Sequence, residues 1–368
     1  MKNTFGNNIT VTLFGESHGP CVGAVVDGVP AGIRIDMDLL ARMMNQRKAS
    51  SNISTPRQEK DIPQIVSGVL DGVTEGTPVT FLIPNEKKIS HDYNALAGKP
   101  RPSHADYAAR MRYRGYEDAN GGGHFSGRLT APLVAAGALC MQMLAEKGIA
   151  IGTHIASLHG IKDRPFDEEN LAADIAVLAE KKFPVLDEKA DELMRQAILE
   201  AAAGKDSLGG ILDTAVIGLD AGIGEPWFDS VESMLAHGLF SIGAVKGVEF
   251  GTGFGFEALK GSQANDPFVI RDGKVVTLTN HNGGLNGGLT NGMPVRFRTV
   301  VKPTPSIAQK QKTVDLEKFE ETEIEISGRH DPAIIHRARA AVDAVTAITL
   351  CDLLTARYGT SYFEGEGK

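Results

Sequence analysis

Three loops in this sequence carry groups that could hold an anion or move a proton. The loop 15–19, G-E-S-H-G, follows an alternating apolar run and places a hydroxyl beside an imidazole. A Pro-flanked segment further on holds Arg101 and His104, and the glycine-rich segment 121–128 ends in Arg128 at the start of an apolar helix. An arginine fork suits phosphate, a histidine suits proton donation to a departing oxygen, and a helix N-terminus attracts anions. Solvated loops would also contain such residues, so each segment alone leaves its role open.

Two later segments are similar in character. Residues 302–307, K-P-T-P-S-I, offer an ammonium and two hydroxyls, which suit a phosphate monoester, although turn formation alone would also explain them. Residues 328–332, G-R-H-D-P, end a strand and open the last helix, with Asp331 as a natural N-cap and Pro332 at the first helical position. The ten histidines show no metal-binding spacing, so no metal site is expected. Six of them are assigned to structure or surface: His91, His154, His159, His237, His281 and His336.

The loop 15–19 also matches G-x-S-x-G, the nucleophile elbow of α/β-hydrolases, with Ser17 as the nucleophile. An elbow needs a strand before the serine and a helix after it. Residues 20–26 are instead β-branched and broken by glycine, which predicts a second strand. The pattern therefore favours a loop that presents His18 for proton transfer or for stabilising an anion.

Alternating and apolar runs define the elements that must bring these loops together. Strands are predicted at residues 9–14, 23–29, 64–69, 78–83, 210–219, 245–250, 294–301 and 322–326. Helices are predicted at residues 38–46, 129–146, 187–203 and 332–357. The second and fourth helices are apolar on most faces, so we expect them to lie between layers, with the sheets outside. The strand-and-loop layouts that end at residues 19 and 331 are alike, which suggests an internal duplication.

Composition limits the class of protein. The 368 residues carry 38 Lys and Arg against 46 Asp and Glu, a net charge of −8, which excludes a generally basic nucleic-acid binder. An anionic ligand would therefore need a local cluster of cations. The cysteines Cys21, Cys140 and Cys351 are far apart and fit core packing in a reducing compartment. The apolar stretch 129–145 falls short of a membrane span and the first residues show no leader, so we expect a cytoplasmic protein that binds no membrane.

Taken together, these segments resemble the chorismate synthase family over essentially the whole chain. The family's marks are a G-E-S-H-G loop near the start, an R-P-G-H-A-D-Y segment, a triple-glycine loop ending in Ser-x-Arg, a K-P-T-S-S-I segment and a terminal G-R-H-D-P. All five occur here in order between Gly15 and Pro332. We therefore expect an α+β fold in one large domain, residues 1–368, with helices sandwiched between β layers, although length alone favours two domains. The resemblance also implies a homotetramer.

The resemblance implies a lyase that converts 5-enolpyruvylshikimate 3-phosphate to chorismate by anti 1,4-elimination of phosphate, the last common step of aromatic amino acid biosynthesis. Reduced FMN is bound but not consumed in the family, where it is thought to lend an electron that labilises the C3–O bond. NADPH would enter only as a source of reduction. The substrate carries about four negative charges. A net-acidic protein would therefore concentrate arginines in one pocket.

Matched position by position, the resemblance assigns roles to residues of this chain. His18 would protonate the reduced flavin, and His104 would protonate the departing phosphate. Asp331, with Ser17 near it, would shuttle the flavin proton. The residues expected to hold the substrate anions are Arg47, Arg101 and Arg128. The expected flavin contacts are His124, Phe125, Ser126, Gly243, Ala244, Gly287, Lys302, Pro303, Thr304, Pro305, Ser306 and Arg329.

The chain departs from the family's pattern at four places. The common R-R-R-P-G is here Q-R-K-A-S at residues 46–50, Ser103 replaces a glycine, Pro305 replaces a serine, and residues 124–130 lack an Arg and a Glu near the flavin. None of these departures touches the two histidines, so the activity is retained as the expectation. Two other interpretations stay open: a serine hydrolase that uses Ser17, and a flavin- or phosphate-binding protein without lyase activity.

Overall fold

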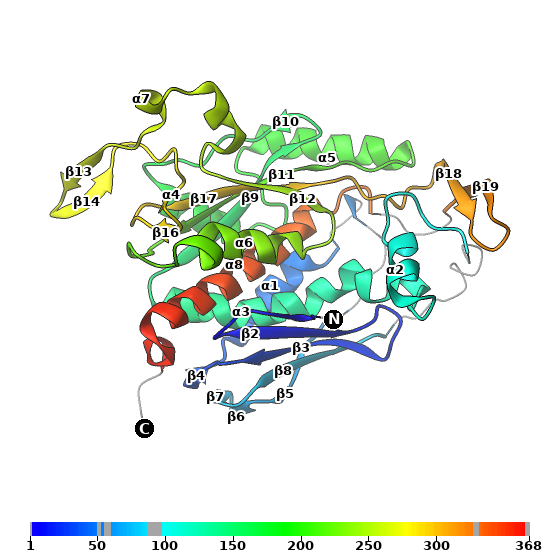
Figure 1. Cartoon of the computed structure of the whole chain (residues 1–368), viewed down its shortest axis with the longest axis horizontal. Helices are drawn as coiled ribbons and strands as arrows, with labels where there is room; N and C mark the ends of the chain where they lie inside the picture. The colour runs from blue at the N-terminus through cyan, green and yellow to red at the C-terminus, as the bar shows by residue number, and fades with distance from the viewer. Residues whose placement is uncertain (1, 50–52, 55–59, 87–97, 327–330, 365–368) are drawn as a thin grey trace.

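The computed structural model describes residues 2–49, 53–54, 60–86, 98–326 and 331–364, in which two five-stranded antiparallel sheets enclose a layer of helices (Figure 1). The first sheet has the order β1-β2-β3-β8-β5, with strands Thr4–Phe5, Thr10–Gly15, Cys21–Asp27, Val79–Pro84 and Gln64–Ser67. The second has the order β10-β9-β11-β17-β12, with strands Ile161–Lys162, Ala150–Leu158, Gly210–Ile217, Val295–Val301 and Val245–Phe250. Smaller sheets pair β4 (Ala31–Arg34), β7 (Val73–Glu75) and β6 (Val69–Leu70), β13 (Phe268–Arg271) with β14 (Lys274–Thr277), β15 (Leu285–Asn286) with β16 (Leu289–Thr290), and β18 (Lys310–Asp315) with β19 (Glu320–Glu325).

The helices between the large sheets form the core. They are α1 (Met37–Arg47), α3 (Thr130–Glu146), α6 (Val231–Phe240) and α8 (Ile335–Tyr358). Helix α3 packs on β3 and β8, α8 packs on β9 and β11, and the two helices pack on each other. They approach closely at Gly137, where a Cβ atom would lie 2.2 Å from the Cβ of Ala344. The predicted sandwich, with helices inside and sheets outside, is confirmed.

Helix α3 also explains the longest apolar stretch of the sequence. Residues 127–146 are long and apolar enough to cross a membrane, but 78% of the most apolar window is buried inside the protein. Burial of side chains such as Leu139 and Leu144 contributes about 1.5–3 kcal/mol each to folding. The stretch is therefore a core helix, as its sequence predicts.

The remaining helices are α2 (Asp106–Tyr113), α4 (Leu171–Glu180), α5 (Glu188–Ala203) and the short α7 (Gly261–Ala264). Helix α4 packs on β9, and with Phe166 and Ala215 it forms a second, smaller core. Because α8 covers one face of β9 and α4 covers the other, this strand is buried on both faces and has no alternating pattern. Strand β9 was not predicted from the sequence for this reason. Helices α2, α4 and α6 were not predicted because they are short.

The two halves of the molecule repeat one topology. Without the edge strands β1 and β10, each sheet has its strands in the chain order first, second, fourth, third. Each half has a helix between its second and third strands, α1 or α6, and a long helix after its fourth, α3 or α8. This repetition agrees with the predicted internal duplication, but the equivalent loops differ from those that suggested it. In chain order Asp331 comes just before α8, so it corresponds to the segment before α3 rather than to loop 15–19; residues 328–330 lie outside the described residues.

Candidate active site

Loop 15–19 connects β2 to β3 and lies against the glycine-rich loop. The Ser17 hydroxyl is buried, lies 2.9 Å from His18 Nδ1 and donates to the carbonyl oxygen of Asn120 at 3.1 Å. The Ser17 backbone N–H donates to the carbonyl oxygen of Gly123 at 3.1 Å. Because a strand rather than a helix follows this loop, the nucleophile-elbow interpretation of Ser17 is wrong.

The triple glycine lies between two histidines. Gly121 has φ +60°, and a Cβ atom there would lie 2.2 Å from His18 Cε1. Gly122 has φ +84°, and a Cβ atom there would lie 3.2 Å from His104 Cε1. Only glycine allows both the positive φ and these close approaches. Two imidazoles that are far apart in sequence therefore meet the same short loop.

The segment before α2 is held by one carboxylate. Asp106 accepts hydrogen bonds from Arg101 Nε and Nη2, both at 2.7 Å, and lies 2.6 Å from His104 Nδ1. Burial raises the pKa of Asp106, but the hydrogen bonds with Arg101 and His104 outweigh burial and hold that pKa well below its usual range. Ser103 has φ +57°, and Lys302 Nζ donates to its carbonyl oxygen at 2.7 Å.

A second buried carboxylate joins two of the predicted substrate arginines. Asp61 accepts from Arg47 Nη1 at 2.7 Å and from Arg128 Nη1. Burial raises the pKa of Asp61, but the charges of Arg47 and Arg128 and the hydrogen bond from Arg128 outweigh burial and lower that pKa below its usual value. Arg128 Nε also donates to Asn85 Oδ1 at 2.9 Å, and Asn85 Nδ2 donates to the carbonyl oxygens of Glu16 and Gly19. The arginines and loop 15–19 are thus one hydrogen-bonded unit.

Residues 302–306 lie against the same segment. The Lys302 backbone N–H donates to the carbonyl oxygen of Ala244 at 2.9 Å, and Arg101 Nη1 donates to Ser306 Oγ at 3.4 Å. Thr304 Oγ1 is buried and has no hydrogen-bond partner among the described residues. The Lys302 ammonium, which bonds to the Ser103 carbonyl oxygen, and the Arg101 guanidinium, which bonds to Ser306, are groups that can bind a phosphate at this segment.

Asp331 reaches the arginines through α8. Its Oδ2 accepts from Arg337 Nη1 at 2.6 Å, and Arg337 Nε donates to the carbonyl oxygen of Arg47 at 3.0 Å. The prediction that Asp331 caps the last helix is wrong, because α8 begins at Ile335. Its carboxylate is paired with a cation of the first helical turn instead.

The predicted flavin contacts are distributed unevenly. His124 Nδ1 lies 2.9 Å from the carbonyl oxygen of Gly15, and Ser126 Oγ accepts from the Arg128 backbone N–H. Phe125 is half exposed beside α2. Gly287 lies in the β15–β16 turn, at the opposite end of the molecule from α2, so the structure does not bring it to this cluster within one chain (Figure 1). Arg329 lies outside the described residues.

Sequence reasoning missed three side chains of the site, Asp61, Asn85 and Arg337, and it noted Asp106 without giving it a role. Asp106 belongs to a singled-out segment, and its spacing of two residues from His104 was the available signal. The other three lie in segments where no motif draws attention to them, and only folding brings them to the site.

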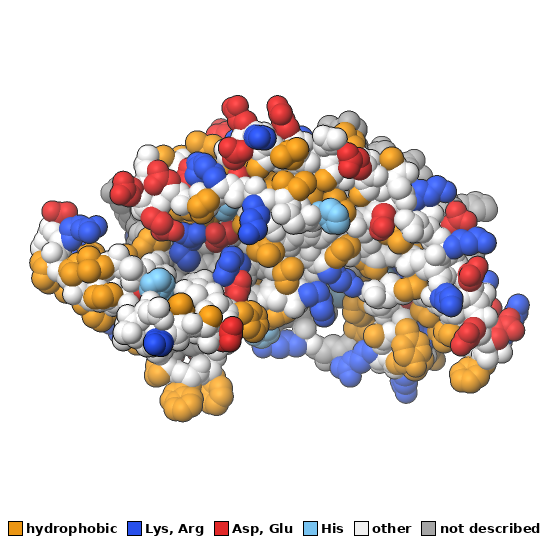
Figure 2. Space-filling model, turned by 90° about the horizontal axis from the view of Figure 1, so that it is seen from above, with side chains coloured by type: hydrophobic (Ala, Val, Ile, Leu, Met, Phe, Trp, Pro, Cys, Tyr) orange, Lys and Arg blue, Asp and Glu red, His pale blue; other side chains and the backbone are white. Residues whose placement is uncertain are grey.

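Among the described residues, the site contains the cations Arg47, Arg101, Arg128, Lys302 and Arg337 and the carboxylates Asp61, Asp106 and Asp331. Lys182 lies near Lys48 and Arg337, and burial, followed by these two like charges, lowers its pKa. The space-filling view shows Lys and Arg side chains along the lower edge of its right half, with Asp and Glu side chains among them at the far right (Figure 2). The expected local cluster of arginines therefore occurs in a chain of net charge −8.

A family model described as "Chorismate synthase" matches residues 9–355 of the chain. The chain belongs to the chorismate synthase family. A chorismate synthase of Thermococcus gammatolerans is 44% identical over 352 residues, covering 96% of this chain and 97% of that protein. One of Dehalococcoides mccartyi is 42% identical over 354 residues, with 96% of each covered. A crystal structure of chorismate synthase shares the fold with a TM-score of 0.72 at 26% identity, over 96% of this chain and 94% of that one.

Chorismate synthases convert 5-enolpyruvylshikimate 3-phosphate to chorismate, and this lyase reaction of aromatic amino acid biosynthesis is the activity of the chain. The alternatives of a serine hydrolase and of a binding protein without lyase activity are therefore wrong. The family uses reduced FMN and acts on a small anionic substrate.

Proposed function

We propose that elimination of phosphate takes place around the triple glycine, with His18 on one side and His104 on the other. The observation that carries this proposal is that Gly121 and Gly122 lie against these two imidazoles. Arg128, at the end of the same loop, shares the Asp61 carboxylate with Arg47. His104 would donate a proton to the departing phosphate, because a phosphate leaves more easily when its bridging oxygen is protonated or hydrogen-bonded.

The substrate anions would be held by Arg47, Arg101 and Arg128. Asp61 and Asp106 already bond to these arginines, so the guanidinium planes are fixed before the substrate arrives. A pre-oriented fork binds a carboxylate or phosphate without first losing side-chain entropy.

Reduced FMN would be held by residues 124–126, Gly243, Ala244 and residues 302–306, with Arg329 as a further contact. Two cations at this segment support a phosphate-bearing group here: the Lys302 ammonium on the Ser103 carbonyl oxygen, and Arg101, which bonds to Ser306. When bound, the reduced flavin supplies an electron that labilises the carbon–oxygen bond to phosphate. His18 would keep the flavin in its required protonation state, and Ser17, 2.9 Å from His18 Nδ1, would fix the ring of that histidine. Asp331 would take part in returning the proton, and NADPH would serve only as a source of reduction.

We further propose a cytoplasmic homotetramer of single-domain subunits. The position of Gly287 supports an assembly. It lies at the opposite end of its own chain from α2, so as a flavin contact it would have to serve the site of a neighbouring subunit.

The test is turnover under anaerobic conditions with pre-reduced FMN and the enolpyruvyl substrate. The His104→Ala variant is expected to release phosphate about 10²–10⁴-fold more slowly while it binds reduced FMN nearly as well as the unmodified enzyme. Wild-type turnover in this variant would remove His104 from the mechanism.

A further inference from the structure

The carboxylate of Asp106 is surrounded by two residues of its own segment. Its Oδ1 lies 2.6 Å from His104 Nδ1 and 2.7 Å from Arg101 Nη2, and its Oδ2 accepts from Arg101 Nε at 2.7 Å and from the Arg101 backbone N–H at 3.0 Å. Asp106 is the first residue of α2, but the N-terminus of that helix has no side-chain cap. The Asp106 carboxylate therefore accepts hydrogen bonds from His104, the candidate acid, and from Arg101, the candidate anion ligand, and does not cap the helix.

This arrangement determines which nitrogen of His104 carries hydrogen. An ionised carboxylate only accepts hydrogen bonds, so His104 Nδ1 must be the donor in the 2.6 Å contact. Arg101 Nη2 also lies 3.0 Å from Nδ1, but a guanidinium only donates, so that contact cannot be a hydrogen bond while Nδ1 is protonated. The ring therefore has Nε2 as its exchangeable position, on the side of the glycine loop, where Nε2 would be 3.6 Å from a Cβ at Gly122.

We propose that Asp106 is a positioning residue for the elimination: it fixes the His104 ring with Nδ1 protonated, so that Nε2, on the side of the glycine loop, faces the reacting phosphate. This inference rests on the proposed role of His104 as proton donor. A carboxylate that orients a catalytic imidazole has a large effect on turnover, because the wrong tautomer cannot exchange the proton in the required direction. The same grip on Arg101 keeps the anion clamp and the acid at a fixed separation.

The experiment is a double-mutant cycle of Asp106→Asn and His104→Ala, measured as phosphate release with pre-reduced FMN. Asp106→Asn is expected to lower kcat about 10²-fold or more in the otherwise unmodified enzyme. In the His104→Ala background the same substitution is expected to change kcat by less than about threefold, because its effect on kcat passes through the imidazole. Loss of the Asp106 contacts with Arg101, which binds the substrate anion, is expected to change KM in both backgrounds. Asp106→Glu, which keeps a carboxylate, is expected to recover at least about tenfold of the lost rate.

The matched control is Asp163→Asn. Asp163 also bonds to a histidine through Nδ1, that of His154, but on the far side of the second sheet. This variant is expected to lose stability and to keep its kcat per folded molecule, with folded protein measured by urea unfolding. It separates a general loss of folding from a loss of positioning.

The outcomes are distinct. A wild-type kcat in Asp106→Asn, a rise in KM alone, or an equal loss in both backgrounds would overturn the positioning role while the proposed role of His104 stands. Wild-type turnover in His104→Ala would overturn the role of that histidine, and the positioning role with it. Should Asp106→Asn fail to fold, Asp106→Glu is measured in the same two backgrounds. A change in kcat when His104 is present, and none in the His104→Ala background, supports the positioning role; an equal change in both overturns it.

Discussion

Two histidine–aspartate pairs in this chain have nearly the same contact and different surroundings. His104 Nδ1 lies 2.6 Å from Asp106, and His154 Nδ1 lies 2.8 Å from Asp163. The side chains of the first pair are 19% and 26% exposed, whereas those of the second are 1% and 0% exposed. The contact alone therefore does not distinguish a candidate catalytic pair from a structural one.

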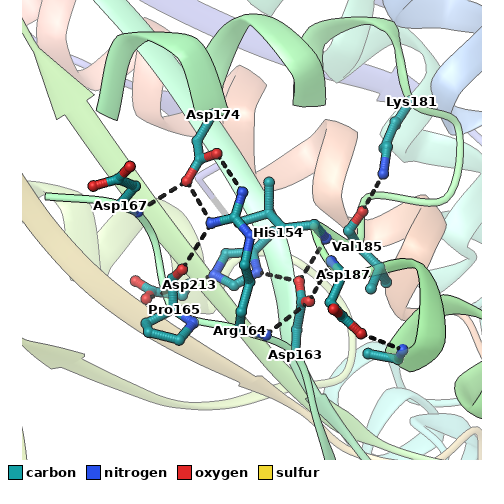
Figure 3. Close-up of polar contacts among 12 residues, drawn as sticks. His154, Asp163, Arg164, Pro165, Asp167, Asp174, Lys181, Val185, Asp187 and Asp213 are labelled. Atoms are coloured by element: carbon teal, nitrogen blue, oxygen red, sulfur yellow. Dashed lines mark hydrogen bonds and ion pairs between the residues drawn. The ribbon is translucent and has the colours of Figure 1, made fainter. Parts of the chain in front are cut away.

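The surroundings of the second nitrogen make the difference. His154 Nε2 faces another carboxylate, Asp213, at 3.8 Å (Figure 3). Arg296 Nη2 bonds to that carboxylate at 2.8 Å. Asp163 also accepts from the backbone N–H groups of Leu186 and Asp187, at 2.7 and 2.9 Å. Every side of the His154 pair is closed by protein, so it fastens the chain before α5 to β9. His104 instead turns Nε2 toward a loop of glycines.

The largest expected effect comes from removing the charge of Asp163. Asp163→Asn would leave the buried imidazole beside a neutral amide, and breaking a buried pair in this way costs about 3–5 kcal/mol of the free energy of unfolding. Urea unfolding at pH 7 measures this loss. Asp106→Asn is expected to lose less than this, because the Asp106 side chain is 26% exposed and water replaces part of the lost interaction with Arg101. If the two substitutions destabilised the chain equally, the distinction between the pairs would be broken.

A third histidine sharpens the comparison through its pH dependence. Burial, and then the charges of Arg337, Arg195 and Lys182, lower the pKa of His336 to about 3. Between that pKa and about 6.5 the unfolded chain binds a proton that the folded chain does not, so stability falls as the pH falls. At about 1.4 kcal/mol per pH unit, the loss at pH 5 is about 2 kcal/mol. His336→Gln is expected to remove this loss in urea unfolding at pH 5 and 7.5. An unchanged pH dependence would contradict the neutral, buried imidazole.

His154 is expected to behave with the opposite sign. Burial lowers its pKa, but the hydrogen bonds and charges of Asp163 and Asp213 outweigh burial and raise it. Its contribution to stability is therefore full below about pH 6.5 and is lost as the pH rises through the raised pKa. His154→Gln should destabilise the chain more at pH 6 than at pH 9. We expect a smaller change than for His336, because the cost of burying the charges offsets part of the gain. A larger loss at pH 9 would reverse the assignment.

The sequence predicted those parts of the fold that have a periodic or a strongly apolar signal. Helices α3 and α8 are apolar on most faces, and their burial between two sheets follows from that pattern. Strand β9 was missed because it is covered on both faces and includes Gly152 and His154 within its apolar run. The duplication was predicted from the wrong pair of loops, because the similarity lies in strand order, which is not written in any local motif.

The candidate site divides in the same way. Glycine-rich and proline-flanked loops are visible in the sequence, because turns and close approaches require particular residue types. Asp61 was not predicted, since its two arginine partners lie 14 and 67 residues away along the chain. Nor could the sequence indicate that Gly287 lies far from His18 and His104 of its own chain, because its position depends on how the β15–β16 turn packs in the folded protein.

The smallest expected effect tests how much strain the segment of His104 holds. Ser103 has φ +57°, a conformation that costs a residue with a Cβ atom roughly 1 kcal/mol and costs glycine nothing, and the family has glycine at this position. Ser103→Gly is expected to change the free energy of unfolding by less than about 1 kcal/mol, because relief of strain is offset by the greater entropy of the unfolded chain. Its kcat should stay within about twofold, because the contacts that orient this turn come from the backbone: Lys302 Nζ to the carbonyl oxygen of residue 103, and the His104 N–H to the carbonyl oxygen of Arg101. A kcat loss above tenfold would mean that the Ser103 hydroxyl itself orients His104, and the pair would then depend on more than its carboxylate.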